Sequence, residues 1–190
     1  MNKIFNNSLN DIKVGIVVPV YNARKTLKAC VKSLINQTHE NISIVLVDDG
    51  STDGSSKLCD ELSCLDERIT VIHQENKGST VARNTGFSSE WVRSSKYTMT
   101  CDADDTFTKE AVKEMVLLAE KNGADIVCGK YRRVWKNIAL PIKEYQRPCF
   151  NIEEAKVYEN QDIIEKLYVG CFGISDFPVC LCSKLYKTYL

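Results

Sequence analysis

Residues 42–54 read Ile-Ser-Ile-Val-Leu-Val-Asp-Asp-Gly-Ser-Thr-Asp-Gly, an apolar run that changes abruptly into a polar one. The apolar part is rich in β-branched residues, which predicts a strand that is buried on both faces of a parallel sheet. The polar part contains too much Asp, Gly and Ser to continue a strand, so it predicts a turn that leads to a helix N-terminus. The stretch is therefore one strand-to-helix unit.

The same pattern recurs on both sides of this unit. Upstream, residues 14–20 form a second β-branched run that should end near Pro19, and apolar residues at helical spacing follow from Leu27 to Ile35. Three short apolar runs follow downstream, separated by helical patterns: residues 69–73, the run that begins at Tyr97, and residues 124–128. This alternation predicts an α/β protein with a doubly wound, mostly parallel sheet and helices on both faces.

Less regular segments flank these units. Leu58, Leu62 and Leu65 mark the helix that follows residue 54. We expect residues 131–135 to continue the sheet, and residues 137–149, which contain two prolines, to form a loop.

Composition and charge argue against several classes of function. The 190 residues include 25 Lys and Arg and 25 Asp and Glu, so the formal net charge is +0, which argues against nucleic acid as a partner. No apolar run approaches the roughly 18 to 20 residues that span a bilayer. We therefore expect a cytoplasmic protein, with peripheral association at the inner face of the membrane left open. Nine cysteines without a Cys-x-x-Cys pair, and two histidines, favour reduced thiols over a structural zinc site.

Three carboxylates follow the strand that begins at Tyr97, namely Asp102, Asp104 and Asp105. Carboxylates this close repel one another and need a counter-charge, so they are candidates for holding a divalent cation. The alternative is an acidic turn in which Asp105 or Thr106 caps the next helix. This stretch alone leaves both interpretations open.

Unusual residues also end the other predicted strands. Pro19 and Tyr21 follow the first strand, and Asp48 and Asp49 follow the second. Ligands of open parallel sheets bind at the carboxyl ends of the strands. The sequence therefore predicts a ligand site at this edge of the sheet.

A nucleoside diphosphate with a metal ion fits these residue types. Tyr21 can support the base, Asp49 can accept from a base or ribose donor, and Mg²⁺ or Mn²⁺ on Asp104 can bridge the phosphates. Lys77 and Arg83 can add charge-assisted contacts to the same anion, although each can also be a solvated surface cation. Neither a Gly-x-x-x-x-Gly-Lys-Ser/Thr loop nor a Gly-x-Gly-x-x-Gly turn is present, which argues against triphosphatase and dinucleotide-binding functions.

Six motifs, in order and spacing, resemble the nucleotide-binding half of the inverting GT-A glycosyltransferases of family 2. They are Ile16-Val-Val-Pro-Val-Tyr-Asn22, Gln37-Thr38, Val45-Leu-Val-Asp-Asp-Gly-Ser-Thr-Asp-Gly54, Asn76-Lys-Gly78, Ala82-Arg-Asn-Thr-Gly86 and Asp102-Ala-Asp-Asp105. Ser183-Lys-Leu-Tyr186 resembles a segment of the acceptor half in bacterial members. The resemblance implies a single domain over residues 1–190, with the donor half at 12–106 and a C-terminally truncated acceptor half at 107–190.

The resemblance implies transfer of a hexose-type sugar from a nucleotide-diphosphate sugar to a hydroxyl, with inversion. A UDP-sugar is the expected donor, a glycan or lipid-linked molecule the expected acceptor, and cell-envelope or exopolysaccharide synthesis the expected setting. Carried over by position, the nucleotide-binding residues are Pro19, Tyr21, Asp49, Arg83 and Asp102, and the ligands of Mn²⁺ or Mg²⁺ are Asp104 and Asp102. Lys77 joins the nucleotide-binding set on its charge.

Two departures from the family pattern stand out. Phe87–Lys96 is longer than the usual connection; a surface excursion and a partner contact are the two alternatives, and we expect the surface excursion. The family places its general base shortly after the Lys-Leu-Tyr segment, so the base is expected beyond Leu190 and the chain as given should be inactive. Glu165 and Asp176 do not match the motif and are expected to be surface carboxylates. The non-enzyme alternative is a nucleotide-binding or interaction module without transferase activity.

Overall fold

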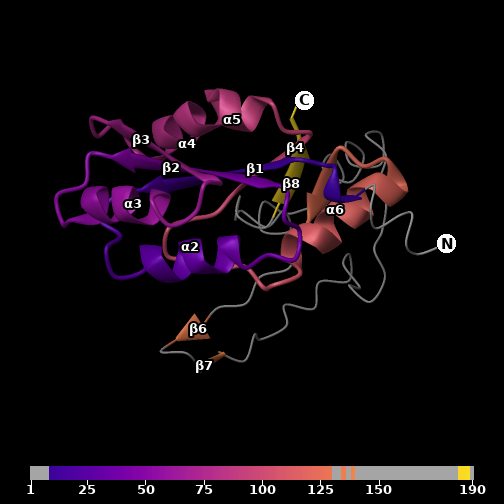
Figure 1. The fold of residues 1–190 in the computed structure, drawn as a ribbon, viewed down its shortest axis with the longest axis horizontal. Helices are drawn as coiled ribbons and strands as arrows, with labels where there is room; N and C mark the ends of the chain where they lie inside the picture. Colours follow the sequence, from indigo (N-terminus) through magenta and orange to yellow (C-terminus); the bar gives the residue numbers. More distant parts are fainter. Residues whose placement is uncertain (1–8, 130–133, 136–137, 140–183, 189–190) are drawn as a thin grey trace, which may run out of the picture. The chain divides into compact units, whose positions relative to one another are not determined.

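The computed structural model describes residues 9–129, 134–135, 138–139 and 184–188, which belong to two compact units. The larger unit contains a six-stranded sheet in the order β3-β2-β1-β4-β8-β5 (Figure 1). Its strands are β1 Val14–Val20, β2 Ile42–Asp49, β3 Ile69–Gln74, β4 Tyr97–Thr100, β5 Ile126–Cys128 and β8 Lys184–Lys187. Its helices are α2 Leu27–Ile35, α3 Ser55–Ser63, α4 Ser79–Ser88, α5 Glu90–Arg93 and α6 Ala111–Asn122.

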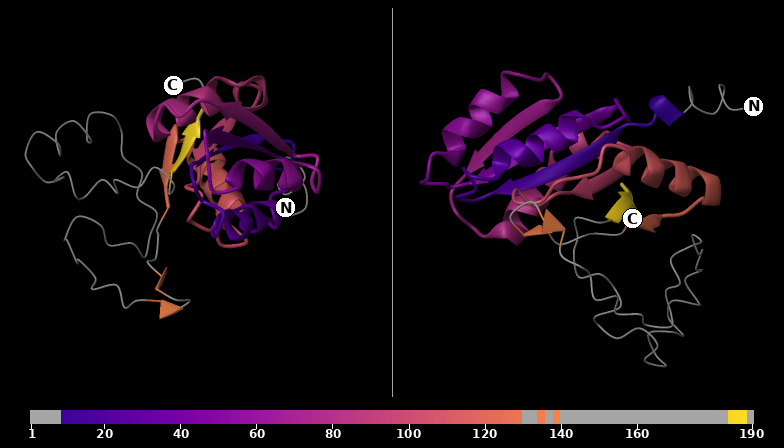
Figure 2. Two further views of the ribbon diagram at one scale, coloured as in Figure 1. Left: turned by 90° about the vertical axis from the view of Figure 1, so that its left-hand side faces the viewer. Right: turned by 90° about the horizontal axis from the view of Figure 1, so that it is seen from below.

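The sheet is mostly parallel, as the strand and helix alternation predicts. β1 pairs in parallel with β2 and β4, and β2 pairs in parallel with β3. β8 is antiparallel to both of its neighbours, β4 and β5. It therefore lies among strands from the first part of the chain, as its yellow ribbon shows in Figure 2.

Helices cover both faces of the sheet, which confirms the doubly wound α/β class. α2 and α3 lie on one face, and α4 and α5 lie on the other (Figure 1). Alternate residues of β1 divide between two apolar cores: Ile16 and Val18 pack toward α2 and α6, whereas Val17 packs toward α4 and α5. Every residue of β2 is buried, because this strand is covered on both faces.

Gly86 allows α4 to approach the sheet closely. A Cβ atom at this position would lie 2.4 Å from Cγ1 of Val17 on β1, a distance that real Cβ atoms do not show. The glycine thus sets the height of α4 above the sheet. This matters for the site, because α4 carries Ala82 and Arg83.

The structure corrects the expectation for Phe87–Lys96. This segment is not simply a surface excursion, because it contains the short helix α5, and Val92 of that helix is fully buried against β1. Trp91 remains 39% exposed. The absence of a Cβ on Gly15 makes room for Val92, whose Cα and Cγ1 lie about 3 Å from the position that a Cβ would take.

Three other sequence predictions are wrong. Leu65 lies outside α3 and is 77% exposed. In the smaller unit, β6 (Val134–Trp135) does not continue the main sheet but pairs with β7. The strand β7 (Ile138–Ala139) itself lies in residues 137–149, which were expected to form a loop. Glu165 and Asp176 lie outside the described residues. No helix in the described parts of the chain is long and apolar enough to cross a membrane.

Candidate functional site

A pocket of about 320 Å³ lies where β1, β2 and β4 end. Six of the seven residues that the sequence predicts for the site line it: Pro19, Tyr21, Asp49, Arg83, Asp102 and Asp104. Lys77 does not line the pocket, and its backbone N–H instead donates to Asp49. The structure therefore brings the residues from three strand ends and α4 together, while their individual roles stay predictions.

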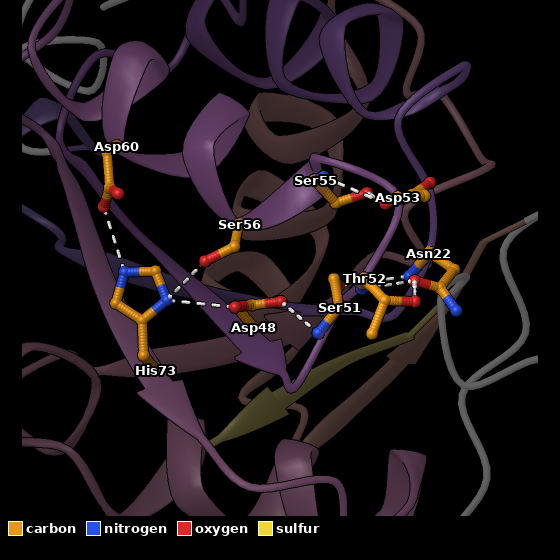
Figure 3. A network of polar contacts seen from close by, with 9 residues as sticks. All are labelled: Asn22, Asp48, Ser51, Thr52, Asp53, Ser55, Ser56, Asp60 and His73. Carbon is orange, nitrogen blue, oxygen red and sulfur yellow. Dashed lines mark hydrogen bonds and ion pairs between the residues drawn. The ribbon is translucent and has the colours of Figure 1, made fainter.

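One wall of the pocket is the loop that follows β1. Tyr21 lies at the rim with 52% of its surface exposed, and Asn22 has a left-handed backbone with φ of 50°. The Asn22 side-chain oxygen accepts a hydrogen bond of 2.8 Å from the backbone N–H of Thr52, and the Asn22 N–H donates to Ser51 Oγ at 3.1 Å (Figure 3). These contacts offset the strain of the left-handed conformation and fix the loop to the turn after β2.

The same turn holds the start of α2. Ser55 Oγ accepts from the backbone N–H of Ala23 at 2.9 Å, and Asp53 accepts from the backbone N–H of Arg24 at 3.0 Å. Gly54 has φ of 90°, which favours glycine, and a Cβ there would meet the Arg24 guanidinium at 2.9 Å. The Asp-Gly-Ser-Thr-Asp-Gly turn therefore forms a rigid backing for the pocket wall.

Asp49 is buried at the floor of the pocket and is ionised. Burial acts to raise the pKa of its carboxyl, but hydrogen bonds from Lys77 N, Gln74 Nε2 and Gly78 N outweigh this and hold the pKa below its ordinary value. These bonds are 2.9, 2.7 and 2.8 Å long. A carboxylate accepts about four hydrogen bonds, so Asp49 keeps room for one further donor.

Gln74 is a residue that the sequence interpretation missed. Parallel pairing of β2 and β3 places it opposite Asp49, and Thr85 Oγ1 on α4 donates to its Oε1 at 2.8 Å. The Gln74 amide is therefore oriented with its NH₂ group toward the carboxylate. Only the sheet register reveals this role, because nothing in the local sequence distinguishes Gln74 from a polar loop residue.

Arg83 and Asp102 form an ion pair across the pocket. Arg83 Nη2 lies 2.6 Å from Asp102 Oδ1, so Arg83 is not a solvated surface cation. Its Nε is buried and has no hydrogen-bond partner among the described residues. A buried donor without a partner costs about 1–3 kcal/mol, and a ligand that offers an acceptor would remove that cost.

The acidic segment after β4 alternates between core and pocket. Cys101 and Ala103 are buried, whereas Asp102 is half-buried and Asp104 is exposed. The interpretation of Asp105 or Thr106 as a helix cap is wrong, since α6 begins only at Ala111 with Glu110 at its N-cap. Asp105 therefore does not cap α6.

The donor set fits a Mg²⁺ or Mn²⁺ ion that is shared with a substrate. No group of three or more His, Cys, Asp or Glu side chains that could enclose a metal occurs within the described residues. Asp102 and Asp104 nevertheless both line the pocket, and carboxylate oxygens are the hard donors that Mg²⁺ and Mn²⁺ prefer. Mg²⁺ commonly binds one or two carboxylates together with substrate phosphates, which matches two carboxylates beside an open cavity.

Comparisons with known proteins agree on one family. The model of glycosyl transferase family 2 matches residues 15–185. Glycosyltransferase GlyA of Streptococcus pneumoniae is 37% identical over 182 residues, which cover 96% of this chain and 25% of GlyA. The chain thus spans about a quarter of that relative's length.

Solved structures share the fold at low sequence identity. Staphylococcus aureus TarS 1–349 in complex with UDP-GlcNAc has a TM-score of 0.66 at 20% identity, over 93% of this chain and 46% of TarS 1–349. Mannosyltransferase PcManGT of Pyrobaculum calidifontis, in complex with GDP-Man and Mn²⁺, has a TM-score of 0.57 at 20% identity. The likeness covers 63% of this chain and 35% of PcManGT. Together with the match over residues 15–185, the α/β sheet and its strand-end pocket make this chain a member of glycosyl transferase family 2, with the GT-A fold.

Proposed function

We propose that the chain binds a UDP-sugar together with Mn²⁺ or Mg²⁺, as the donor-binding part of an inverting glycosyltransferase. The single observation that carries this proposal is the composition of the strand-end pocket. Tyr21 and Asp49 line it together with Asp104 and the Arg83–Asp102 ion pair. TarS with UDP-GlcNAc and PcManGT with GDP-Man and Mn²⁺ support the ligand class.

Each residue of the pocket has its own role in this proposal. The Tyr21 ring supports the base, and the ionised Asp49 accepts from a donor on the base or ribose. Asp102 and Asp104 hold the metal ion, while Arg83 fixes the orientation of Asp102. The bound metal supplies electrostatic stabilisation of the departing diphosphate, which is worth several kcal/mol. The Nε of Arg83, which has no hydrogen-bond partner in the part of the chain that the structure describes, adds a donor for a ligand oxygen.

Transfer also needs a general base beside the acceptor hydroxyl. The resemblance to the family supports an acidic residue in this role. The same resemblance supports a glycan or lipid-linked acceptor, in cell-envelope or exopolysaccharide synthesis at the cytoplasmic side of the membrane.

Calorimetric titration with UDP-sugars and GDP-sugars, with and without Mn²⁺, tests the donor proposal. Asp104→Asn should weaken Mn²⁺-dependent binding by at least about tenfold, because a hard oxygen ligand is lost. Its circular dichroism and urea unfolding should match those of the wild type, since Asp104 is exposed. Asp105→Asn is the matched control, as it removes a neighbouring carboxylate that does not line the pocket.

Two results would contradict the proposal. The first is a wild-type chain that binds no nucleotide-diphosphate sugar in Mn²⁺. The second is an Asp104→Asn variant whose binding depends on Mn²⁺ as strongly as that of the wild type.

A further inference from the structure

His73, the fifth residue of β3, lies between two carboxylates from different elements. Its Nδ1 is 3.0 Å from Oδ2 of Asp48 on β2, and its Nε2 is 3.0 Å from Oδ1 of Asp60 on α3 (Figure 3). A neutral imidazole carries a hydrogen on only one ring nitrogen, so its other nitrogen would direct a lone pair at a carboxylate. As the imidazolium, His73 donates to both carboxylates, and Ser56 Oγ lies 3.3 Å from the same Nδ1 that faces Asp48.

The surroundings of His73 favour the charged form. Its pKa is raised above the ordinary value, first by the hydrogen bond with Asp48 and then by the one with Asp60. Cys59 of α3 stays neutral, because burial, followed by the charges of Asp48 and Asp60, raises its pKa to about 12. The remaining charged pair on α3, Lys57 with Glu61, is exposed.

A continuous chain of polar contacts joins His73 to the pocket wall. Asp48, which is buried, accepts a hydrogen bond of 3.1 Å from the backbone N–H of Ser51. Ser51 Oγ accepts from the backbone N–H of Asn22, and the Asn22 side chain accepts from Thr52 (Figure 3). Asn22 lines the pocket next to Tyr21.

Asp48 and Asp49 thus play different parts. Parallel register pairs Asp48 with His73 and Asp49 with Gln74, and successive side chains of a strand point to opposite faces. Asp49 lines the pocket, whereas Asp48 is bonded to His73 and to the turn behind the pocket wall.

We propose that His73 is a positioning residue for the donor pocket: as the imidazolium it fixes Asp48, and through Ser51 and Thr52 it holds Asn22 and Tyr21 in place for the nucleoside. The ligand in this inference rests on the proposed function. The coupling between His73 and Asn22 does not, because it is a property of the chain without a ligand.

Loss of the His73 proton should loosen this wall. Above the raised pKa the neutral ring can donate to only one of the two carboxylates, so either Asp48 or Asp60 loses a hydrogen bond. We expect the dissociation constant of a UDP-sugar to increase about fivefold as pH rises through that pKa, at the low end of site-to-site coupling. The pH series should use a UDP-sugar rather than UDP, because its diphosphate is esterified at both ends and has no proton that titrates near neutral pH.

The first experiment is a pH titration of the ligand-free 190-residue chain by NMR. The chain has two histidines, so the ring signals of His73 can be followed with the buried His39 as an internal reference. We expect the amide signals of Asn22 and Thr52 to titrate with the His73 midpoint, and this titration to vanish in His73→Gln. Asp60→Asn, which removes the exposed partner only, should lower the ring and amide midpoints together.

The second experiment measures UDP-sugar binding over the same pH range. The wild type should lose about fivefold in affinity, His73→Gln should show a flat profile, and Asp60→Asn should shift the profile to lower pH. A purely structural role would lower affinity in the variants without moving the midpoint.

The outcomes separate the two proposals. Amide signals of Asn22 and Thr52 that ignore the His73 midpoint, or an unchanged affinity profile in His73→Gln, overturn the inference. A wild type that binds no UDP-sugar at any pH refutes the proposed function and the affinity effect, and the amide titration then decides the coupling by itself.

Discussion

Replacing Gly86 by alanine should push α4 away from β1. The added Cβ would lie 2.4 Å from Cγ1 and 3.0 Å from Cγ2 of Val17. Val17 is fully buried, so its methyl groups cannot move into solvent. Overpacking of this kind costs about 1–3 kcal/mol, and two methyl groups in contact favour the upper end.

Part of this cost is offset within the helix. Alanine is about 1 kcal/mol more favourable than glycine inside a helix. We therefore expect Gly86→Ala to lower the free energy of unfolding by about 2 kcal/mol. The displaced helix should also carry Arg83 away from Asp102, now at 2.6 Å, and so weaken nucleotide binding.

Urea unfolding followed by circular dichroism measures the stability change. Asn84→Ala is the control, since Asn84 is exposed on the same helix and its replacement should change stability by less than about 0.5 kcal/mol. Val17→Ala should lower stability by about 2 kcal/mol when made alone. In the double variant the methyl group that Gly86→Ala adds occupies the space that Val17→Ala vacates. The stability lost by the double variant should therefore be about 1–2 kcal/mol smaller than the sum of the losses in the two single variants.

The reasoning fails if Gly86→Ala is as stable as the wild type, or if its effect and that of Val17→Ala are additive. Either result would mean that α4 tolerates a larger separation from β1 than its packing indicates.

Three further predictions follow from other contacts. Thr85→Val removes the hydroxyl that orients Gln74 and should weaken nucleotide binding severalfold while lowering the free energy of unfolding by about 1 kcal/mol, as calorimetry and urea unfolding would show. Because the pKa of His73 is raised in the folded state, its contribution to stability is complete below its unfolded pKa and is lost as pH rises through the folded pKa. The difference in unfolding free energy between wild type and His73→Gln should therefore shrink as pH rises. A difference that stays constant with pH would contradict this prediction. In the native protein near pH 8 iodoacetamide should modify the exposed Cys64 and spare Cys59, whose pKa of about 12 keeps the thiol protonated, and peptide mass spectrometry of the labelled chain would detect the opposite pattern.

Local patterning predicted most of the sheet. The β-branched run at residues 14–20 and the apolar spacing from Leu27 to Ile35 coincide with β1 and α2, because both elements bury faces that sequence periodicity reports directly. The Asn122-Gly123 pair is a typical helix stop, and Gly123 ends α6 in a left-handed conformation.

Elements that depend on distant partners were harder to predict. α5 is four residues long, too short for a helical period, and Val92 is buried only because Gly15 leaves space on β1. β8 is formed by four residues near the end of the chain, which complete the sheet by pairing with β4 and β5. Such pairing depends on the whole fold rather than on propensity.

The two carboxylates at the end of β2 show the same division. The sequence by itself predicted that Asp48 and Asp49 begin the turn after a buried strand and that the strand ends gather the ligand-binding residue types. In the structure both residues still belong to β2, so their side chains point to opposite faces of the sheet. Only the tertiary structure decided that Asp49 lines the pocket beside Gln74 while Asp48 pairs with His73 behind it. The physical reason is that their partners come from β3, and the register between β2 and β3 is set by packing across the sheet rather than by residues near Asp48 and Asp49 in the chain.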